Sequence, residues 1–470
     1  MPGFDHFDDD FQPPKPNRNS DDDLRRFREQ LKNGEKDINS TEALEEIVQF
    51  YFEHEQFDEA LHFIDRLLSF EPYSSEAWQR KGMILNNLQR YQEALECYAR
   101  ALGLNPTDPD IFVNQGITLD NLNQVKEALA SFESALGVDP SYEDALLHKG
   151  ITLEKQEQFG EAAQVFERMI CLNPDHPEAW YELGYCYDFL DKLDESIRCY
   201  QEHLKHDPFN ANAWYNLGIV LSRKGNFEKA VECYEYSIAI NEKFPSAWYN
   251  LGNSYANLGR LFDAIDCYKK TIEFDSEDVP AWHNLGNAYE ELGQFEEAIA
   301  AYGKAIELDP KRHESYYARG CCYDALEQPA KALADYRSAI RFCKDDPEIW
   351  YARADAEYNV GKYHDCLSSY RILLKLSPKN SEAWFDYGDT LQELGQSREA
   401  IEALKRSISL SANNPLAYYS LGKACLLARR KGQAMEALRK AFEMKPELKE
   451  TFVIEFPVLS LQSDFSSLLG

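Results

Sequence analysis

The stretch NAWYNLG at residues 212–218 recurs as SAWYNLG at residues 246–252 and as PAWHNLG at residues 280–286. The step from each copy to the next is 34 residues. Counting by 34 in both directions, without inserting or deleting a residue, divides Thr41 to Leu448 into twelve contiguous repeats. A constant period is typical of a repeat array, so we expect one elongated array and not the several globular domains that 470 residues alone would suggest.

The same residue types return at fixed positions within the repeats. Numbered from the N-terminus, the repeats begin at Thr41, Ser75, Pro109, Glu143, Pro177, Ala211, Pro245, Val279, His313, Pro347, Ser381 and Pro415. All seven tryptophans occupy position 4, glycine occupies position 8 in ten repeats, and alanine occupies position 20 in ten. Because a glycine inside a helix costs about 1 kcal/mol relative to alanine, its recurrence in register predicts close approach of a neighbouring helix at positions 8 and 20.

Proline marks the boundaries between repeats. It occupies position 32 in eight repeats, and in the other four it is displaced to the first or second position of the next repeat. Either placement ends one helix and suits the first turn of another. Each repeat is therefore predicted to form two antiparallel helices, with apolar residues at positions 4, 7, 11 and 24 between them. No single repeat could bury that face alone.

This pattern of Trp, Gly, Ala and Pro resembles the tetratricopeptide repeat, whose period is also 34 residues. The resemblance covers 408 of the 470 residues, Thr41 to Leu448. It implies an all-α fold: a right-handed superhelical solenoid of tandem helix-turn-helix repeats whose first helices line a concave groove. For function it implies protein binding and nothing more specific.

The two ends depart from the repeat. Residues 1–19 are acidic and rich in proline, which predicts a disordered leader. Residues 20–40 are expected to form a short capping helix and a linker, the alternative being a loose helix that packs on nothing. Residues 449–470 are expected to hold a C-terminal capping helix and an apolar tail. That tail is either docked on repeat 12 or offered to a partner.

Composition restricts the partners and the location. Lys and Arg number 50 and Asp and Glu 81, giving a formal net charge of −31. This acidity disfavours nucleic acid and favours basic proteins or peptides. No signal pattern or long apolar segment is present, so we expect a cytoplasmic protein without membrane insertion. Cys97, Cys199, Cys233 and Cys267 all occupy position 23 and are too far apart in successive helix pairs for disulfides, so they are interpreted as buried thiols.

The sequence offers little for catalysis or cofactors. It has no phosphate-binding loop, no HExxH and no CxxC. His203, His206 and Cys199 have metal-ligand spacing, but they occupy packing positions. Cys321 and Cys322 have no histidine base at readable spacing, and acidic pairs such as Asp345–Asp346 are interpreted as solvated. We therefore predict no enzymatic activity, no cofactor and no metal site.

The most informative polar residues are the asparagines of repeats 6 to 8. In tetratricopeptide arrays, positions 2, 5, 6, 9, 12 and 13 of the first helix face the groove. Carried over to this sequence, those positions hold the candidate peptide-binding residues Asn212, Tyr215, Asn216, Tyr249, Asn250, Asn253, Asn257, His283, Asn284 and Asn287. A side-chain amide offers both a donor and an acceptor, so a row of amides can hold the backbone of an extended peptide whatever its side chains.

This row resembles the asparagine ladder in the repeats of O-linked N-acetylglucosamine transferase, without that enzyme's catalytic domain. The pair Asn253 and Asn284 also resembles the carboxylate clamp of chaperone-binding adaptors, but Glu314 and Ala318 stand where that clamp needs Lys and Arg. The alternative to a ligand site is that asparagine is the most common residue at position 6 of this repeat and binds no ligand.

The sequence as a whole predicts a non-enzymatic scaffold or adaptor that binds an extended segment with basic flanks in the concave groove. Acidic residues at the groove-facing positions on either side of the asparagines favour those basic flanks and a salt-sensitive association. The alternative is a structural subunit that forms homo-oligomers through its terminal repeats and apolar tail.

Overall fold

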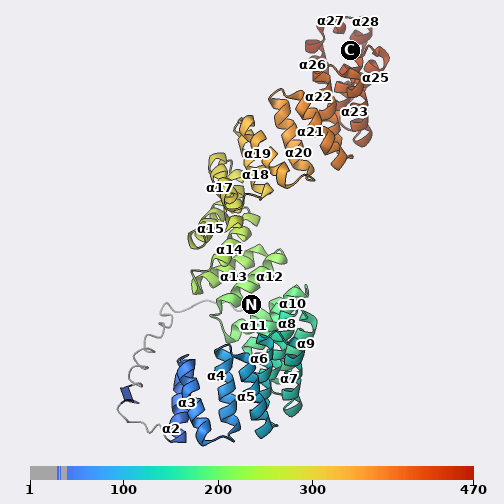
Figure 1. The fold of residues 1–470 in the computed structure, drawn as a ribbon. Coiled ribbons are helices and arrows are strands. Elements are labelled where there is room, and N and C mark those ends of the chain that lie inside the picture. The colour runs from blue at the N-terminus through green and yellow to red at the C-terminus, as the bar shows by residue number, and fades with distance from the viewer. Residues whose placement is uncertain (1–28, 31, 33–39, 470) are drawn as a thin grey trace, which may run out of the picture. The chain divides into compact units, whose positions relative to one another are not determined.

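The computed structural model describes residues 29, 30, 32 and 40–469 (Figure 1). The predicted leader at 1–19 and nearly all of the predicted capping helix at 20–40 lie outside the described residues. The described part of the repeat array is built of helices, with no strand among its residues. The predicted all-α fold of tandem helix pairs is therefore confirmed.

Each repeat forms one pair of helices. The first helices are α2 (Thr41–Glu53), α4 (Ser75–Asn87), α6 (Pro109–Asn121), α8 (Glu143–Lys155), α10 (Pro177–Phe189), α12 (Ala211–Arg223), α14 (Pro245–Asn257), α16 (Val279–Glu291), α18 (His313–Ala325), α20 (Pro347–Asn359), α22 (Ser381–Glu393) and α24 (Pro415–Leu427). The second helices are α3 (Phe57–Phe70), α5 (Tyr91–Leu104), α7 (Val125–Val138), α9 (Phe159–Leu172), α11 (Leu193–His206), α13 (Phe227–Ile240), α15 (Leu261–Phe274), α17 (Phe295–Leu308), α19 (Pro329–Phe342), α21 (Tyr363–Leu376), α23 (Ser397–Leu410) and α25 (Lys431–Met444). Every first helix begins at the residue where the 34-residue count starts a repeat.

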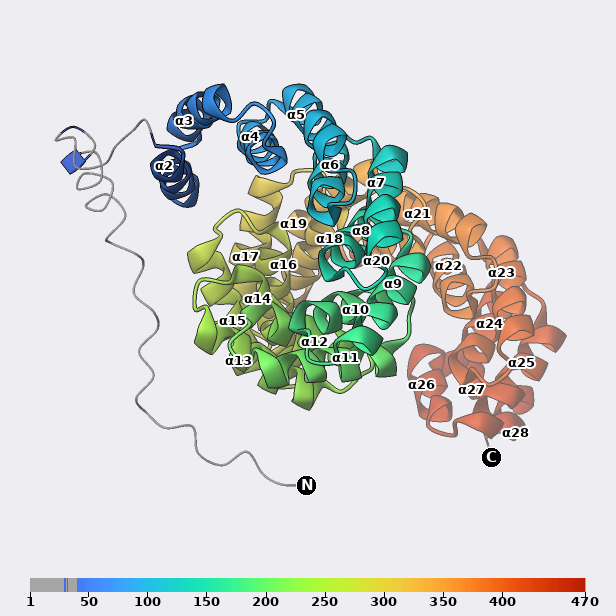
Figure 2. The ribbon, with the colours of Figure 1, turned by 90° about the horizontal axis from the view of Figure 1, so that it is seen from below.

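The chain divides into two compact units. The N-terminal unit ends at Lys224 and the C-terminal unit begins at Gly225, between the two helices of repeat 6. Within each unit the helices follow one another in chain order, and each second helix packs on its own first helix and on the first helix of the next repeat (Figures 1 and 2). First helices also contact the first helices of neighbouring repeats, for example α8 with α10 and α14 with α16. The first helices thus form a shared face in each unit.

Local sequence fixes where each helix begins and ends. Nine first helices are capped by the side chain of the residue before them, as Asn210 caps α12 and Asp278 caps α16. The turn between the two helices of every repeat places position 15 at positive φ, between 56° and 79°. That position is glycine in five repeats, and a side-chain-bearing residue such as Glu157 (φ 58°) in the other seven.

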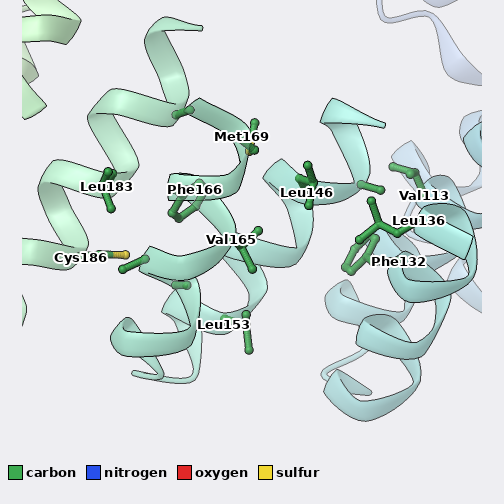
Figure 3. Packing of buried hydrophobic residues seen from close by; sticks show 14 of the residues in the cluster. Val113, Phe132, Leu136, Leu146, Leu153, Val165, Phe166, Met169, Leu183 and Cys186 are labelled. Carbon is green, nitrogen blue, oxygen red and sulfur yellow. The ribbon is translucent and has the colours of Figure 1, made fainter. Parts of the chain in front are cut away.

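The glycines at position 8 are explained by a side chain on the second helix, which is an aromatic ring in most repeats and leucine in repeats 11 and 12. A Cβ added to Gly150 would lie 2.3 Å from the ring of Phe166, and one added to Gly286 would lie 2.5 Å from the ring of Tyr302. Both rings belong to position 24 of their repeats. Phe166 packs in a cluster that runs along successive repeats of the N-terminal unit, together with Phe132 and Leu146 (Figure 3). The predicted close approach at position 8 is confirmed, and the neighbour is the position-24 side chain.

The tryptophans at position 4 have a role that the spacing does not reveal. Each indole N–H donates to the backbone carbonyl six residues earlier, in the loop that joins the repeat to the one before, at 2.8–3.1 Å. Trp350 is buried, and the other six are half-buried. The tryptophans therefore fasten the connections between repeats as well as packing between helices.

The C-terminal end closes repeat 12. Three helices follow α25: α26 (Leu448–Glu455), α27 (Pro457–Ser460) and α28 (Ser463–Leu469). Phe452 and Phe465 are buried in one cluster with Leu438 and Phe442 of α25. Three other apolar side chains of this end remain more than three-quarters exposed, namely Ile454 at 79%, Val458 at 76% and Leu461 at 85%.

Two further expectations concern cysteines and membranes. All eleven cysteines are free thiols, and the four at position 23 are buried, as predicted. Burial raises the pKa of Cys233 and Cys267 to about 12, so these thiols stay protonated. Among the described residues, no helix has the length and apolar content needed to cross a membrane.

Candidate functional site

Four of the ten predicted residues come together on α14 and α16 of the C-terminal unit. Asn253 and Asn257 lie on α14, and Asn284 and Asn287 lie on α16. These two first helices contact each other, which brings equivalent positions of successive repeats side by side. Asn253 and Asn284 are half-buried, whereas Asn257 and Asn287 are exposed.

Hydrogen bonds join these amides across the repeat boundary. The Nδ2 of Asn284 donates both to the hydroxyl of Tyr249 at 3.0 Å and to the Oδ1 of Asn253 at 2.9 Å. Asn287 in turn donates to the Oδ1 of Asn284 at 3.5 Å. Both amide hydrogens of Asn284 are thus occupied within the protein. This asparagine is a connector between repeats 7 and 8.

Two tyrosines from the second helices support the network from below. The hydroxyl of Tyr268 donates to the Oδ1 of Asn253 at 2.9 Å, and that of Tyr302 donates to the Oδ1 of Asn287 at 2.7 Å. The same hydroxyl lies 2.5 Å from a carboxylate oxygen of Glu290, so its single proton is shared between Asn287 and Glu290. Each tyrosine therefore contacts an amide carbonyl, while the amide nitrogen of Asn287 uses one hydrogen on Asn284.

The network borders a pocket of about 410 Å³. Its lining consists of Asn253, Ala256, Asn257, Leu261, Tyr268, Asn284, Asn287, Ala288 and Glu291, and we call it the amide pocket. The two hydrogens on Asn253 Nδ2 have no acceptor among the described residues, and Asn257 uses its own Nδ2 on the carbonyl of Asn253 at 2.8 Å, leaving its Oδ1 open. The pocket thus offers unused donors and acceptors, and its lining includes two alanines.

His283 and Tyr249 are committed to packing between repeats. The Nδ1 of His283 lies 3.0 Å from the Oγ of Ser315, and its ring packs on Tyr302 with 5.4 Å between centroids. Burial, with a smaller effect of Arg312, lowers the pKa of His283 to about 4. The imidazole is therefore neutral at neutral pH, and it positions its neighbours more than it offers a ligand group.

The other four predicted residues do not line the amide pocket. Asn212, Tyr215 and Asn216 belong to α12 of the N-terminal unit, where Asn216 donates to the hydroxyl of Tyr181 at 2.9 Å. Asn250 lies on α14 and is half-buried. Asn216 repeats the bond that Asn284 makes to Tyr249, so one use of asparagine at position 6 is to join a repeat to the tyrosine at position 5 of the repeat before.

Family models place these repeats among known sequences. Models described as tetratricopeptide repeat match residues 75–108, 113–171, 153–218, 211–244, 245–278, 279–312, 301–334, 370–402 and 416–448, and one described as TPR repeat matches 388–427. Together they span well over half of the chain. The chain belongs to the tetratricopeptide repeat family. Its 34-residue repeats are therefore tetratricopeptide repeats, as the resemblance implied.

Solved structures of other proteins are similar to this chain over parts of its length that range from 35% to 91%. The chain is 24% identical to YrrB, "a TPR protein with an unusual peptide-binding site", over 40% of this chain and 96% of that one, with a TM-score of 0.37. It is 24% identical to MamA over 35% and 91%, with a TM-score of 0.35. A chain of the APC/C hetero-tetramer Cut9–Hcn1 is 14% identical over 91% and 95%, with a TM-score of 0.38. No curated protein matches the chain significantly.

Acidic side chains follow the amide pocket along the tetratricopeptide repeats of the C-terminal unit. Burial raises the pKa of Asp324, Asp355 and Asp386, and that of Asp386 reaches about 6. Tyr336 donates to Asp324 at 2.6 Å, and Tyr351 donates to Asp386. These carboxylates are bonded by neutral groups, so a cation brought by a ligand would be favourable there.

The first helices of repeats 4 and 5 carry a different constellation. Glu154 of α8 and Glu182 of α10 are half-buried and affect each other's pKa, and the thiol of Cys186 donates to Glu154 at 2.9 Å. Burial raises the pKa of Glu154 to about 8 and that of Glu182 to about 7. The two carboxyl groups therefore share protons near neutral pH. Phe189, beside them on α10, stacks on Phe159 at 4.4 Å.

Sequence reasoning missed the tyrosines at position 24. Tyr268 and Tyr302 carry hydroxyls below Asn253 and Asn287, whereas repeats 3 and 4 have Phe132 and Phe166 there and isoleucine at position 9. A tyrosine at position 24 paired with a polar residue at position 9 was a readable signal. His203, which the sequence assigned to a packing position, is buried, and its Nδ1 lies 2.9 Å from the carbonyl of Pro177.

Proposed function

We propose that the protein is an interaction scaffold and that the amide pocket on α14 and α16 holds the backbone of an extended peptide segment. Family membership supports the general role, since arrays of stacked helix pairs present long binding surfaces. The observation that carries the specific proposal is the unused hydrogen-bonding capacity of Asn253, Asn257 and Asn287 at one pocket. A peptide backbone presents alternating carbonyl and amide groups, which match those donors and acceptors.

We further propose that the bound segment carries basic residues on the side that faces repeats 9 to 11. Asp324, Asp355 and Asp386 are partly desolvated there and have no cationic partner within the part of the chain that the structure describes. A lysine or arginine of the ligand would stabilise their charged forms. Binding should therefore weaken as salt rises.

The test compares two asparagines that make the same intrahelical bond. Asn257 and Asn87 both occupy position 13, and each donates to the carbonyl four residues earlier, at 2.8 and 2.9 Å. Only Asn257 borders the amide pocket. Peptides selected from a random library on the wild-type protein should bind the Asn257→Ala/Asn287→Ala variant at least about tenfold more weakly, a loss of about 1.4 kcal/mol. They should bind Asn87→Ala normally.

Equal affinity for wild type and the double variant would remove the amide pocket from the binding site. Asn284→Ala is the poorer probe, because Asn284 joins two repeats and its loss changes stability as well as binding. Circular dichroism of each variant separates the two effects.

A second candidate function is self-association through the C-terminal end. Ile454, Val458 and Leu461 present apolar side chains to solvent although Phe452 and Phe465 dock the same segment on repeat 12. Light scattering after size exclusion should show a concentration-dependent oligomer in the wild type. The Ile454→Ser/Leu461→Ser variant should be monomeric, and a monomeric wild type would exclude this role.

A further inference from the structure

A compact group of three metal-ligating side chains lies at the ends of three helices where repeats 9 and 10 meet. His313 is the first residue of α18, Cys343 caps the C-terminus of α19, and Asp346 caps the N-terminus of α20. Their ligand atoms, one from each residue, all lie within 4.8 Å of one another. All three side chains are half-buried, and all belong to the C-terminal unit.

The repeat geometry itself brings these three positions together. They are positions 1, 31 and 34, which in repeat 4 are Glu143, Asn173 and His176. There the Nδ2 of Asn173 donates to Glu143 at 3.2 Å, and the Nε2 of His176 lies 3.8 Å from Glu143. The closeness in repeat 9 is therefore a property of the fold. The chemistry is not, because repeat 9 alone combines histidine at position 1 with cysteine at position 31.

The three groups retain the atoms that a metal ion would need. Asp346 uses Oδ1 to accept the N–H of Glu348 at 2.9 Å, so its Oδ2 is available. The thiol of Cys343 has no hydrogen-bond partner among the described residues. A carboxylate oxygen of Glu314 lies 3.3 Å from the Nδ1 of His313 and can orient the imidazole, as carboxylates do for metal-binding histidines.

We propose that His313, Cys343 and Asp346 form a site for a divalent transition-metal ion, with zinc as the favoured ion. A thiolate and an imidazole select zinc or a similar ion over magnesium and calcium, which prefer oxygen ligands alone. Zinc bonds of about 2.0–2.3 Å in a tetrahedron place ligand atoms about 3.3–3.7 Å apart, so the side chains need close by only about 1.5 Å at most. Water would fill the fourth position.

The metal site is separate from the proposed peptide binding. It lies at the ends of α18, α19 and α20, whereas the amide pocket lies on α14 and α16. It would tie the start of α18 to the loop between α19 and α20, so it would stabilise repeat 9 when metal is present. The ligands stand 30 and 3 residues apart in sequence, which matches no common zinc spacing. Asp346, interpreted from the sequence as solvated, is half-buried.

Cobalt(II) is the probe, because it substitutes for zinc and gives a thiolate charge-transfer band in the near ultraviolet when a cysteine binds it. Titration of the reduced full-length protein should develop this band with one equivalent of cobalt, and zinc should abolish it. Cys343→Ser should lose the band. His313→Ala should bind at least about tenfold more weakly, since even indirect supports of a metal site cost about that much when removed.

The matched control is Cys171→Ser, which removes an exposed cysteine of repeat 4. It should leave the titration unchanged. The proposal is overturned if wild-type protein gives no stoichiometric band, or if the band persists in Cys343→Ser. Should a variant unfold, hydrogen exchange of the wild type decides: zinc should slow exchange in α18 to α20, and unchanged exchange also overturns the proposal.

Discussion

Repeats 4 and 5 of the N-terminal unit and repeats 7 and 8 of the C-terminal unit present equivalent first-helix faces with opposite chemistry. In the first region the first helices carry Glu154 and Glu182, whose pKa values burial raises to about 8 and about 7. In the second they hold Asn253 and Asn284, neutral amides joined by a 2.9 Å hydrogen bond. One backbone arrangement therefore supports both kinds of surface.

The difference shows how burial affects a row of amides and a row of carboxylates. Amides satisfy one another without charge, so Asn253 and Asn284 can be half-buried at any pH at which the protein folds. Two half-buried carboxylates are poorly hydrated, and they repel each other when both are ionised. One proton is therefore retained by the pair. The amide region should accordingly be insensitive to pH, and the carboxylate region should not.

The largest effect is expected at the glycines that admit the position-24 ring. Gly286→Ala would place a Cβ 2.5 Å from Tyr302, displacing the hydroxyl that orients Asn287, and should lower the free energy of unfolding by about 2–3 kcal/mol. Gly184→Ala in repeat 5 meets Tyr200 at 3.2 Å and should cost less than about 1 kcal/mol, because alanine also favours the helix. Urea denaturation followed by circular dichroism measures both. Equal losses would contradict the steric explanation.

The next effect is the pH dependence of the carboxylate region. An acid whose folded pKa exceeds its unfolded value of about 4.5 holds its proton more tightly when folded, so stability is fully present below that pH. This contribution to stability is lost as pH rises through the folded pKa values, about 7 for Glu182 and about 8 for Glu154. Glu154→Gln/Glu182→Gln should therefore raise stability at pH 8.5 by about 1–2 kcal/mol, after allowance for solvent screening, and much less at pH 4.

Urea midpoints of wild type and variant at the two pH values test this. The variant Glu290→Gln, in the amide region, is the control for removing one carboxylate from an equivalent helix face. A gain from Glu154→Gln/Glu182→Gln that is the same at both pH values would contradict the assigned cause.

A smaller effect is expected from replacing the tyrosine whose hydroxyl accepts a hydrogen bond from Asn284. Tyr249→Phe leaves one Asn284 hydrogen without its acceptor and should cost about 1 kcal/mol. Tyr181→Phe removes the equivalent acceptor of Asn216 in the N-terminal unit and should cost about the same. Hydrogen exchange of α14 and α16, or of α10 and α12, locates each loss. If either substitution is silent, its bond does not help to hold the two repeats together.

The smallest effect concerns the turns. The carboxylate region places Glu157 at φ 58°, whereas the amide region uses Gly293 at φ 72°. Glu157→Gly should relieve left-handed strain and stabilise by about 0.5 kcal/mol, the gain being reduced by the greater freedom of glycine in the unfolded chain. Gly293→Glu should destabilise by about 1 kcal/mol. Thermal melts that move in the same direction for both would contradict the explanation.

Much of the fold was predictable because repetition amplifies weak signals. One glycine in a helix says little, but ten at position 8 require a neighbour, and Gly150 and Gly286 do face rings. The candidate site was predictable only in part. Asn253 and Asn287, which the sequence selected as candidates, do line the amide pocket, yet their hydrogen bonds depend on Tyr268 and Tyr302, which come from other helices.

The sequence by itself determined the 34-residue period, the start of every first helix from Thr41 to Pro415 and the burial of the thiols at position 23, because each follows from local propensity repeated in register. Only the tertiary structure decided which amide hydrogens remain open beside Asn253, which carboxyl groups share protons, and that His313 meets Cys343. Those outcomes depend on distances between side chains of different helices. Spacing along one chain does not contain them.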